Sequence, residues 1–435
     1  MFQPTSGGNG GGADGVVPGG GAYRNGSHHV TGPRIRGGRP RRSRDHGDGF
    51  DPRVPPQQEK EKGSTPCTNY DVAYFHSYAH LGIHEEMIKD RVRTETYRNA
   101  ILQHREQIAG KVVVDVGCGT GILSIFCAQA GAKRVYAVDA SDIAVQANEV
   151  IKANNLSDTV IVLHGRVEMD VEIEEKVDVI VSEWMGYMLL YESMLGSVIT
   201  ARDRFLKPGG LILPSYATLY MAPVTHSDRY SESIDFWRNV YGIDMSVMMP
   251  LAKQCAFEEP SVETISGENV LTWPHVVKHV DCSTITIDQL ESVSTKFKFQ
   301  SMMRAPFHGF AFWFDVEFGV SKTHTSSNKA PPTACVEALD NDNDNNNNNN
   351  VTETTQRKKR PNPSDALVLS TAPEDPPTHW QQTVIYFYDP IEVEQDQVIE
   401  GSMVLSQSKE NPRFMNIHLE YASGGRSFVK ESVMR

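Results

Sequence analysis

Two acidic residues, Glu183 and Glu192, enclose the segment SEWMGYMLLYE, which follows a strongly apolar run that begins KVDVIV. Two carboxylates in such a position can bind a planar cation such as a guanidinium. One carboxylate accepts a pair of hydrogen bonds from the cation while the other orients its reacting nitrogen. An exposed loop that carries two acids is the alternative. The apolar and aromatic residues between the glutamates favour a hairpin in a binding site.

A glycine-rich segment, DVGCGTG, places Gly117, Gly119 and Gly121 at alternate positions after a β-branched run. Glycines at a turn from strand to helix let the backbone approach a ligand closely. The spacing differs from the GxGxxG of dinucleotide sites, which argues against an NAD-dependent oxidoreductase. Asp139 ends the next apolar run, where a carboxylate can accept hydrogen bonds from both ribose hydroxyls of a nucleoside. The alternative for Asp139 is an acid in a solvent-facing turn.

These residues need a scaffold of alternating strands and helices. Strands are expected at KVVVDV, RVYAVDAS, VIVLHG, KVDVIVSEW and GLILPS, with helices at ILSIFCAQAGA and over residues 142–154. Short β-branched runs of this kind are typical of buried parallel strands. The pattern predicts an α/β fold with a doubly wound, Rossmann-like sheet in a domain over residues 67–213. Its ligand should lie at the carboxyl ends of the strands.

The pattern changes over residues 214–435. Segments such as GFAFWFDVEF and QTVIYFYD are short and separated by turn residues without helices between them, which predicts an antiparallel β-barrel or sandwich. An Asn-rich insert over residues 321–365 and a Gly- and Arg-rich tail over residues 1–66 are both predicted to be disordered. RIRGGRPRRSR (34–44) is either a solvated tail or an RNA-contacting or self-modified element. Residues 357–360 are either a solvated run or a nuclear-import signal.

The chain is acidic, with 42 Lys and Arg against 55 Asp and Glu and a formal charge of −13. This balance argues against direct nucleic-acid binding through phosphate contacts and suits a cationic partner. The six cysteines are scattered, without a CxxC pair or a cluster at metal-ligand spacing, so we expect reduced thiols and no metal site. We expect neither a signal peptide nor a membrane span, and therefore a protein of the nucleus and cytoplasm.

Four segments, YFHSYAHLGIHEEMIKDRVRT, VVVDVGCGTGILSIFCAQAGA, SEWMGYMLLYES and THW, resemble signature segments of the type I protein arginine N-methyltransferases, in the branch of the sixth member. The resemblance extends from Tyr74 to the C-terminus apart from the Asn-rich insert. It implies an enzyme that transfers methyl groups from S-adenosyl-L-methionine to arginine in histones and other arginine-rich proteins, with a role in chromatin regulation. Monomethyl- and asymmetric dimethylarginine are the implied products, because Met87 and Met194 match residues that line the arginine site of type I enzymes.

The resemblance implies a set of cofactor contacts. Arg93 would hold the carboxylate of the cofactor's amino-acid part, Asp139 its ribose, and Glu168 would lie beside its adenosine and methionine portion. Asp139 stands where many relatives have Glu, which we expect to alter affinity without abolishing binding. The other implied contacts are the loop glycines Gly117 and Gly119, then His84 and Met87 on one helical face, and the lid residues Tyr74, Phe75 and Tyr78, which would close over the cofactor.

The resemblance also implies the catalytic residues. An arginine guanidinium has a pKa above about 12 and stays protonated, so the enzyme must bias its charge toward one nitrogen. Glu183 and Glu192 would do so as the family's double-glutamate hairpin. His379 would join the site from the second domain with Asp90 as its carboxylate partner. His379 would either accept the product proton or hold the N-terminal helix in place.

Residues 225–247 resemble the family's helical dimerisation arm, which implies a homodimer anchored by Phe236, Trp237 and Tyr241. Considered without the family, these residues are compatible with ordinary core aromatics. Two other functions fit parts of the sequence. A methyltransferase for small metabolites would share the cofactor half but would need neither the paired glutamates nor THW. An RNA-binding protein that uses the RGG tail is disfavoured by the acidic composition and the complete catalytic set.

Overall fold

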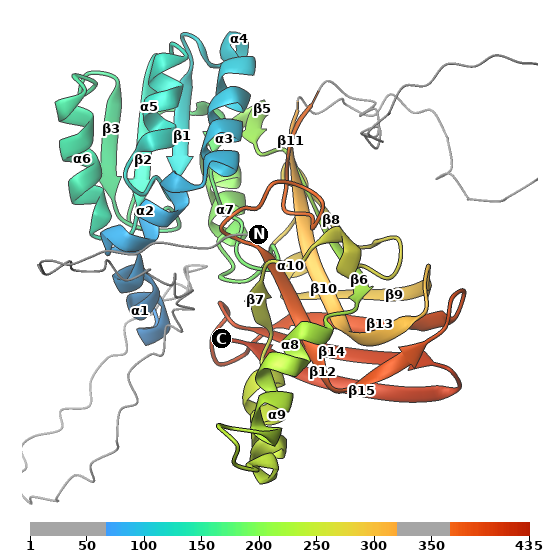
Figure 1. Ribbon diagram of the computed structural model, residues 1–435. Coiled ribbons are helices and arrows are strands. Elements are labelled where there is room, and N and C mark those ends of the chain that lie inside the picture. The colour runs from blue at the N-terminus through green and yellow to red at the C-terminus, as the bar shows by residue number, and fades with distance from the viewer. Residues whose placement is uncertain (1–66, 320–365) are drawn as a thin grey trace, which may run out of the picture. The chain divides into compact units, whose positions relative to one another are not determined.

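The computed structural model describes residues 67–319 and 366–435, which form an N-terminal α/β domain and a C-terminal β domain (Figure 1). The predictions for residues 1–66, for the insert and for the basic runs 34–44 and 357–360 lie outside the described residues. Within the two described ranges, no helix is both long enough and apolar enough to span a bilayer.

A parallel five-stranded sheet forms the centre of the N-terminal domain, with the strand order β3-β2-β1-β4-β5. Every residue of β1 is buried, because β2 and β4 pair with it on either side. The direction of winding changes between β1 and β4, the point at which doubly wound sheets bind ligands. The predicted Rossmann-like sheet is therefore confirmed. Its strands are β1 (Val112–Val116), β2 (Arg134–Asp139), β3 (Val160–His164), β4 (Val177–Val181) and β5 (Leu206–Leu213).

Helices cover this sheet through apolar faces. Ala144, Ala147 and Ile151 recur at helical spacing on the buried side of α6, which packs on β2 and β3. Helix α5 contacts β1, β2 and β3, whereas α7 contacts β4, β1 and β5. The helices of the domain are α1 (Asn69–Tyr78), α2 (Leu81–Lys89), α3 (Arg91–Gln103), α4 (Arg105–Ile108), α5 (Ile122–Gln129), α6 (Ile143–Ala153) and α7 (Leu195–Phe205).

Two antiparallel sheets form the C-terminal domain, which confirms the predicted antiparallel β domain. Aromatic side chains fill the space between the sheets: the ring centroids of Phe310 and Phe387 lie 5.7 and 4.5 Å from that of Tyr421. The first sheet contains β6 (Tyr216–Val224), β7 (Ser261–Glu263), β8 (His275–Asp281), β10 (Ala305–Phe318), β11 (Leu367–Ser370) and β12 (Gln382–Val393). The second contains β9 (Ser292–Gln300), β13 (Val398–Gln407), β14 (Met415–Ser423) and β15 (Arg426–Met434).

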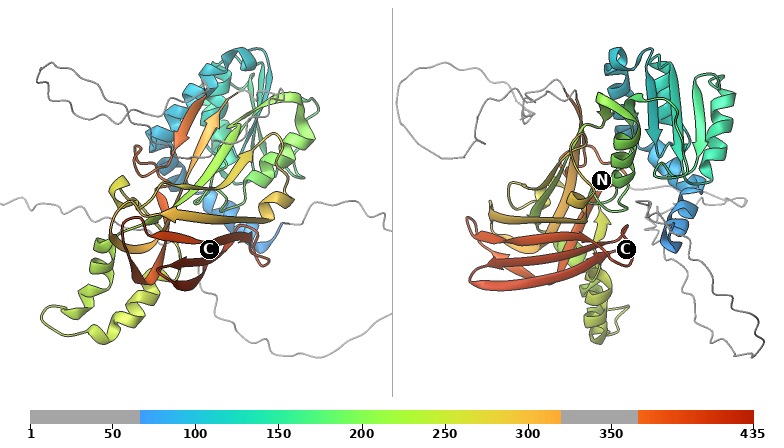
Figure 2. Two further views of the ribbon diagram at one scale, coloured as in Figure 1. Left: turned by 90° about the vertical axis from the view of Figure 1, so that its right-hand side faces the viewer. Right: turned by 180° about the vertical axis from the view of Figure 1, so that it is seen from behind.

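A helical segment projects from the β domain beyond its sheets, as the views in Figures 1 and 2 show. Its base is anchored by Tyr230, whose ring stacks on Phe257 at 4.5 Å, and by Lys430, whose Nζ donates to the Phe257 carbonyl at 2.7 Å. The segment consists of α8 (Ser227–Ser233), η1 (Asp235–Arg238), η2 (Ser246–Met248) and α9 (Met249–Phe257). The remaining short helices of the β domain are η3 (Gly267–Asn269) and α10 (Asp288–Glu291).

Candidate active site

The glycine loop connects β1 to α5 and is tied to the end of β2. The backbone N–H of Gly119 donates to Oδ2 of Asp139 at 2.8 Å, while the N–H and hydroxyl of Ser141 donate to Oδ1 at 2.8 and 2.6 Å. Gly117, Gly119 and Gly121 have φ angles of 73°, 55° and 85°, a region that favours glycine. The sequence placed Asp139 and the glycines in one site, and the structure brings them into direct contact.

Two of these glycines also allow other site residues to approach the backbone. A Cβ atom on Gly117 would lie 2.1 Å from Cε of Met194, and one on Gly119 would lie 3.0 Å from Nδ1 of His84. The other ring nitrogen of His84, Nε2, lies 2.8 Å from the Tyr78 carbonyl. Helix α2, through His84, therefore lies against the glycine loop, and side chains at the loop positions would fill this space.

Arg93 and Glu183 form a buried ion pair. Nε and Nη2 of Arg93 both donate to Oε2 of Glu183 at 3.0 Å, and the two side chains are only 6% and 7% exposed. The other carboxylate oxygen of Glu183, Oε1, accepts from the backbone N–H of Met185 at 3.1 Å. The sequence assigned Arg93 to a cofactor and Glu183 to a substrate. The structure joins the two because α3 and the end of β4 meet at the switch point of the sheet.

Glu192 is held by two tyrosines of α1. The hydroxyls of Tyr74 and Tyr78 donate to the same oxygen, Oε2, at 3.0 and 2.7 Å. Burial raises the pKa of Glu192, and the charge of Glu183 raises it further, against the hydrogen bonds from Tyr78 and Tyr74. Burial also raises the pKa of both tyrosines, so their hydroxyls stay protonated as donors. The sequence placed these tyrosines over the cofactor but did not foresee their contact with Glu192.

The hairpin that carries the glutamates has a strained backbone. Glu192 and Ser193 have φ angles of 72° and 58°, and Met188 and Leu189 also lie in the left-handed region at 53° and 65°. A Cβ atom on Gly186 would lie 2.0 Å from the Tyr191 carbonyl oxygen, so only glycine permits this crossing. Strained backbone of this kind persists where surrounding contacts hold it, and it is concentrated at functional sites.

Asp90 connects helix α3 to the loop of the β domain that contains His379. Its Oδ1 accepts from the Arg93 N–H at 3.0 Å and caps α3, while Oδ2 accepts from the N–H and Nδ1 of His379 at 2.9 and 2.7 Å. Burial alone would raise the pKa of Asp90, but the hydrogen bonds from His379 and Arg93 hold it below its usual value. An ionised Asp90 requires that Nδ1 of His379 carries the proton.

The other residues that the sequence assigned to the cofactor lie on neighbouring elements. Glu168, which follows β3, accepts a hydrogen bond from the hydroxyl of Ser197 on α7. Met87 is half-buried, and its carbonyl lies 3.4 Å from Nη1 of Arg93. The ring of Phe75 packs edge-on against Tyr74, with the centroids 5.5 Å apart. The site therefore combines a glycine loop of the kind that binds nucleosides with the buried acids Glu183 and Glu192, which can bind a cation.

Sequence reasoning missed two residues that shape the site. Trp380 donates from Nε1 to the Met185 carbonyl at 2.8 Å and fixes the hairpin to the β domain. Arg413, from the turn between β13 and β14, donates to the Glu192 carbonyl at 2.9 Å. Trp380 stands beside the singled-out His379, and this adjacency was the available signal. No pattern around Arg413 pointed to the site.

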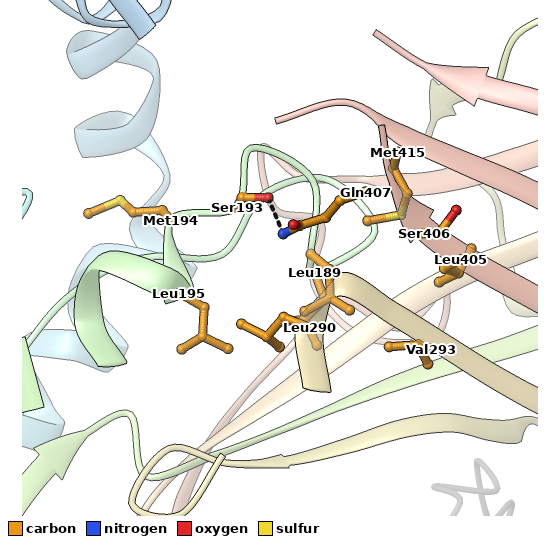
Figure 3. A pocket seen from close by; sticks show the side chains of 11 residues that line it. Leu189, Ser193, Met194, Leu195, Leu290, Val293, Leu405, Ser406, Gln407 and Met415 are labelled. Atoms are coloured by element: carbon orange, nitrogen blue, oxygen red, sulfur yellow. Dashed lines mark hydrogen bonds between the residues drawn. The ribbon is translucent and has the colours of Figure 1, made fainter. Parts of the chain in front are cut away.

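Two hollows adjoin the site. A cavity of about 20 Å³ behind the hairpin is enclosed mainly by apolar side chains such as Leu189, Leu195 and Leu290, and Gln407 donates to Ser193 at 2.9 Å beside it (Figure 3). It is too small for a nucleoside and represents imperfect packing. An open hollow of about 430 Å³ is lined by Glu86, Lys89, Asp90, Arg91, Val92, Pro377 and His379. This hollow therefore lies beside the hydrogen bond between His379 and Asp90.

Two family models match the chain. The arginine methyltransferase oligomerization subdomain matches residues 215–335 and 357–426. Ribosomal protein L11 methyltransferase (PrmA) matches residues 99–215. The two matches adjoin at residue 215, between β5 and β6.

Whole proteins are similar to the chain over most of their length. The probable protein arginine N-methyltransferase 6 of Arabidopsis thaliana is 74% identical over 378 residues, which are 87% of this chain and 85% of that protein. Protein arginine N-methyltransferase 6 of Danio rerio is 42% identical over 373 residues, 85% of this chain and 94% of that protein. The solved structure of Arabidopsis thaliana protein arginine methyltransferase 10 is 34% identical with a TM-score of 0.65, covering 83% of this chain and 100% of that one.

Proposed function

The chain belongs to the type I protein arginine N-methyltransferases, in the branch of the sixth member, and we propose that it forms monomethyl- and asymmetric dimethylarginine on histones and other arginine-rich proteins. The observation that carries the proposal is the buried pair of carboxylates on one strained hairpin, Glu183 and Glu192, beside the cofactor loop. An acidic site of this kind suits a cationic side chain.

The enzyme uses S-adenosyl-L-methionine, and the residues present fit that cofactor. The left-handed backbone of Gly117 and Gly119 shapes the loop at the carboxyl end of β1, where a nucleoside would lie, and Asp139 stands at the adjacent strand end. We assign the ribose to Asp139, the cofactor carboxylate to Arg93, and the adenosine and methionine portion to Glu168. The bound cofactor supplies the activated methyl group. Its demethylated form, S-adenosylhomocysteine (AdoHcy), is present in the solved Trypanosoma brucei PRMT1 enzyme–prozyme complex, which is 32% identical to this chain with a TM-score of 0.67.

The two glutamates bind and polarise the arginine. Both tyrosine hydroxyls use Oε2 of Glu192, so Oε1 is the oxygen that we assign to a terminal guanidinium nitrogen. Glu183 already accepts two bonds from Arg93 and one from the Met185 N–H, and it offers its remaining acceptor position, on Oε1, to a second nitrogen. Negative charge on one side of the guanidinium localises its positive charge there and frees the lone pair of the reacting nitrogen.

His379 and Asp90 hold the domain boundary beside the open hollow. The Nδ1–H bond to Asp90 fixes the ring, which leaves Nε2 as the nitrogen able to accept a proton. We assign His379 to positioning of α3, with release of the product proton through Nε2 as its second possible role. Exclusion of water by Tyr74, Phe75 and Tyr78 supports methyl transfer, because water stabilises the charged starting sulfonium.

We further propose a homodimer formed through the projecting arm. Tyr241, Val247 and Ile243 of the arm are 99%, 83% and 62% exposed, an apolar set that a partner would bury. The family model matched to residues 215–335 and 357–426 is described as an oligomerization subdomain, which supports this proposal. We also propose action on chromatin, on the basis of the proposed histone substrates, and a location in the nucleus and cytoplasm.

The proposed activity is tested by mass spectrometry of histones and of an arginine-rich peptide after incubation with methyl-labelled cofactor. We expect labelled monomethyl- and asymmetric dimethylarginine from the wild-type chain and at least about a hundredfold less of both from Glu192→Gln. A panel of small metabolites serves as the competing substrate set. Label in a metabolite and none in either polypeptide would reject protein arginine as the substrate, and symmetric dimethylarginine would reject the product assignment.

A further inference from the structure

The turn between β13 and β14 reaches from the β domain to two parts of the active site. Arg413 in this turn contacts helix α1 through its guanidinium. It contacts the glutamate hairpin through both its guanidinium and its backbone. α1 and the hairpin are separated by about a hundred residues in the sequence, and Arg413 follows both by more than two hundred. A single side chain thus joins three segments that are distant in the sequence.

The contact with α1 is an ion pair combined with ring stacking. Nε and Nη2 of Arg413 donate to Oδ1 of Asp71 at 3.0 and 2.8 Å. The guanidinium carbon lies 3.8 Å from the ring centroid of Tyr74 and 5.3 Å from that of Phe75. A planar guanidinium can make both contacts at once, whereas an ammonium cannot. Arg413 therefore holds the same turn of α1 that presents Tyr74 to Glu192.

The contact with the hairpin is reciprocal. Nη1 of Arg413 donates to the Glu192 carbonyl at 2.9 Å, and the Glu192 N–H donates to the Arg413 carbonyl at 3.1 Å. The hydroxyl of Ser193 donates to the Pro412 carbonyl at 2.6 Å. Glu192 and Ser193 both have left-handed φ angles, so these bonds support backbone that would otherwise relax.

Helix α1 depends on such contacts because it has no apolar face of its own in the core. None of its ten residues is fully buried, and Tyr74 and Tyr78, which face Glu192, are half-buried. An isolated helix of this length is marginal in water. Asp71 also completes the capping box of the helix, since its Oδ2 accepts from the N–H and hydroxyl of Thr68, the N-cap residue, at 3.0 and 2.9 Å. Loss of the Arg413 side chain would therefore loosen the part of α1 that carries both Asp71 and Tyr74.

We propose that Arg413 is a positioning residue that couples α1 to the glutamate hairpin. By contacting both segments, it keeps Tyr74 and Tyr78 within hydrogen-bond distance of Glu192. This proposal rests on the proposed function in one respect, that Glu192 binds the substrate arginine. Arg413 acts through Asp71, Tyr74 and the Glu192 backbone, and in this proposal it does not contact the substrate guanidinium.

Hydrogen–deuterium exchange of the full chain, followed for residues 69–78, tests the coupling directly. In Arg413→Ala we expect faster exchange in α1 and about a tenfold lower kcat/KM on an arginine peptide, because small displacements at a site cost rate steeply. The matched control is Arg304→Ala, which removes an arginine paired with Glu394 at 3.4 Å on exposed strand ends. Exchange in α1 equal to wild type in Arg413→Ala, or equal loosening in Arg304→Ala, would overturn the proposal.

Arg413→Lys covers the case in which Arg413→Ala does not fold. Lysine keeps a charge near Asp71 but loses the paired donors and the stacking on Tyr74. The α1 exchange rate and kcat/KM of Arg413→Lys should therefore lie between those of wild type and those expected when all Arg413 contacts are lost. A lysine variant that matches wild type in both measurements would contradict the proposal. Hydrogen–deuterium exchange can be measured whether or not the enzyme transfers methyl groups. If α1 exchanges faster in Arg413→Ala but the wild-type chain does not methylate arginine, the proposed function is rejected while the coupling by Arg413 stands.

A double-mutant cycle with Asp71→Asn separates coupling from general destabilisation. Because Arg413 acts in part through Asp71, the double variant Asp71→Asn/Arg413→Ala should increase α1 exchange by less than the sum of the two single effects. Additive effects of the two substitutions on α1 exchange would show that the two residues act independently, and that result would also overturn the proposal.

Discussion

Nε and Nη2 of Arg93 both lie 3.0 Å from a single carboxylate oxygen of Glu183, and both side chains are almost fully buried. The residue assigned to the cofactor carboxylate and a residue assigned to the substrate guanidinium are therefore one electrostatic unit. A change in the charge of either residue acts on both binding sites, which distinguishes Glu183 from Glu192.

Glu183→Gln should impair both folding stability and catalysis. The substitution leaves the Arg93 guanidinium buried without its counter-charge, and breaking a buried pair in this way costs about 3 kcal/mol. We expect a lower free energy of unfolding in urea, together with weaker cofactor binding by calorimetry. Glu85→Gln is the matched control, because Glu85 pairs with Lys89 on an exposed helix face. Equal unfolding free energies for the two variants would show that the Arg93 pair carries no special weight.

Glu192→Gln should impair catalysis while cofactor binding survives. Its carboxylate is bound by tyrosine hydroxyls, which can also donate to an amide oxygen, so the fold should tolerate the change. Turnover should fall by roughly 10² to 10⁴, or about 3 to 5 kcal/mol, as is typical of lost electrostatic stabilisation in a water-excluded site. Single-turnover rates on an arginine peptide and calorimetry with S-adenosyl-L-methionine provide the measurement. A near-normal rate would exclude a mechanism in which Glu192 binds and polarises the substrate guanidinium.

The raised pKa of Glu192 predicts the acid limb of the pH–rate profile. A cation is bound by the ionised carboxylate, so kcat/KM should fall as the pH drops through a value above the usual glutamate pKa of about 4.3. For folding the sign is opposite. The native state favours protonated Glu192, and this contribution to stability is present at low pH and is lost as the pH rises through the raised value. An acid limb at the ordinary glutamate pKa would contradict this assignment.

Asp139→Ala should weaken cofactor binding before it affects turnover at saturation. The side chain accepts bonds from Gly119 and Ser141, so its loss also frees the glycine loop. We expect the cofactor Kd to rise at least tenfold, with a smaller change in kcat, whereas Glu192→Gln should give the reverse pattern. Asp142→Ala, three residues further along and 84% exposed, provides the control. Unchanged cofactor affinity in Asp139→Ala would remove the ribose assignment.

The arm should control the oligomeric state. Trp237→Ala/Tyr241→Ala removes two aromatic residues from the projecting segment, of which Tyr241 is 99% exposed in the single chain. We expect monomers by light scattering and a lower cofactor affinity than in wild type, for which we propose a dimer. Trp273→Ala, a substitution of another exposed aromatic outside the arm, should leave the dimer intact. A wild-type chain that is already monomeric would remove the homodimer proposal.

The α/β domain could be predicted from the sequence because its determinants are local. β1, the glycine loop and α5 follow one another along the chain. Gly117, Gly119 and Gly121, at alternate positions of that loop, all have positive φ angles. Asp139 ends the strand that pairs with β1, so its proximity to Gly119 follows from parallel pairing alone. Hydrophobic runs and glycine spacing are properties of residues that are neighbours in the sequence, so they can be recognised without knowledge of the tertiary fold.

The contacts of the catalytic acids were decided only by the tertiary structure. Nothing in the sequence indicates that Arg93 faces Glu183, that Tyr74 and Tyr78 share one oxygen of Glu192, or that Arg413 holds both α1 and the hairpin. These partners are brought together by the docking of α1, α3 and the β13–β14 turn around the switch point. Side-chain pairing across such distances in the sequence depends on how packed elements meet, and the periodicity of each element specifies only which of its faces is buried.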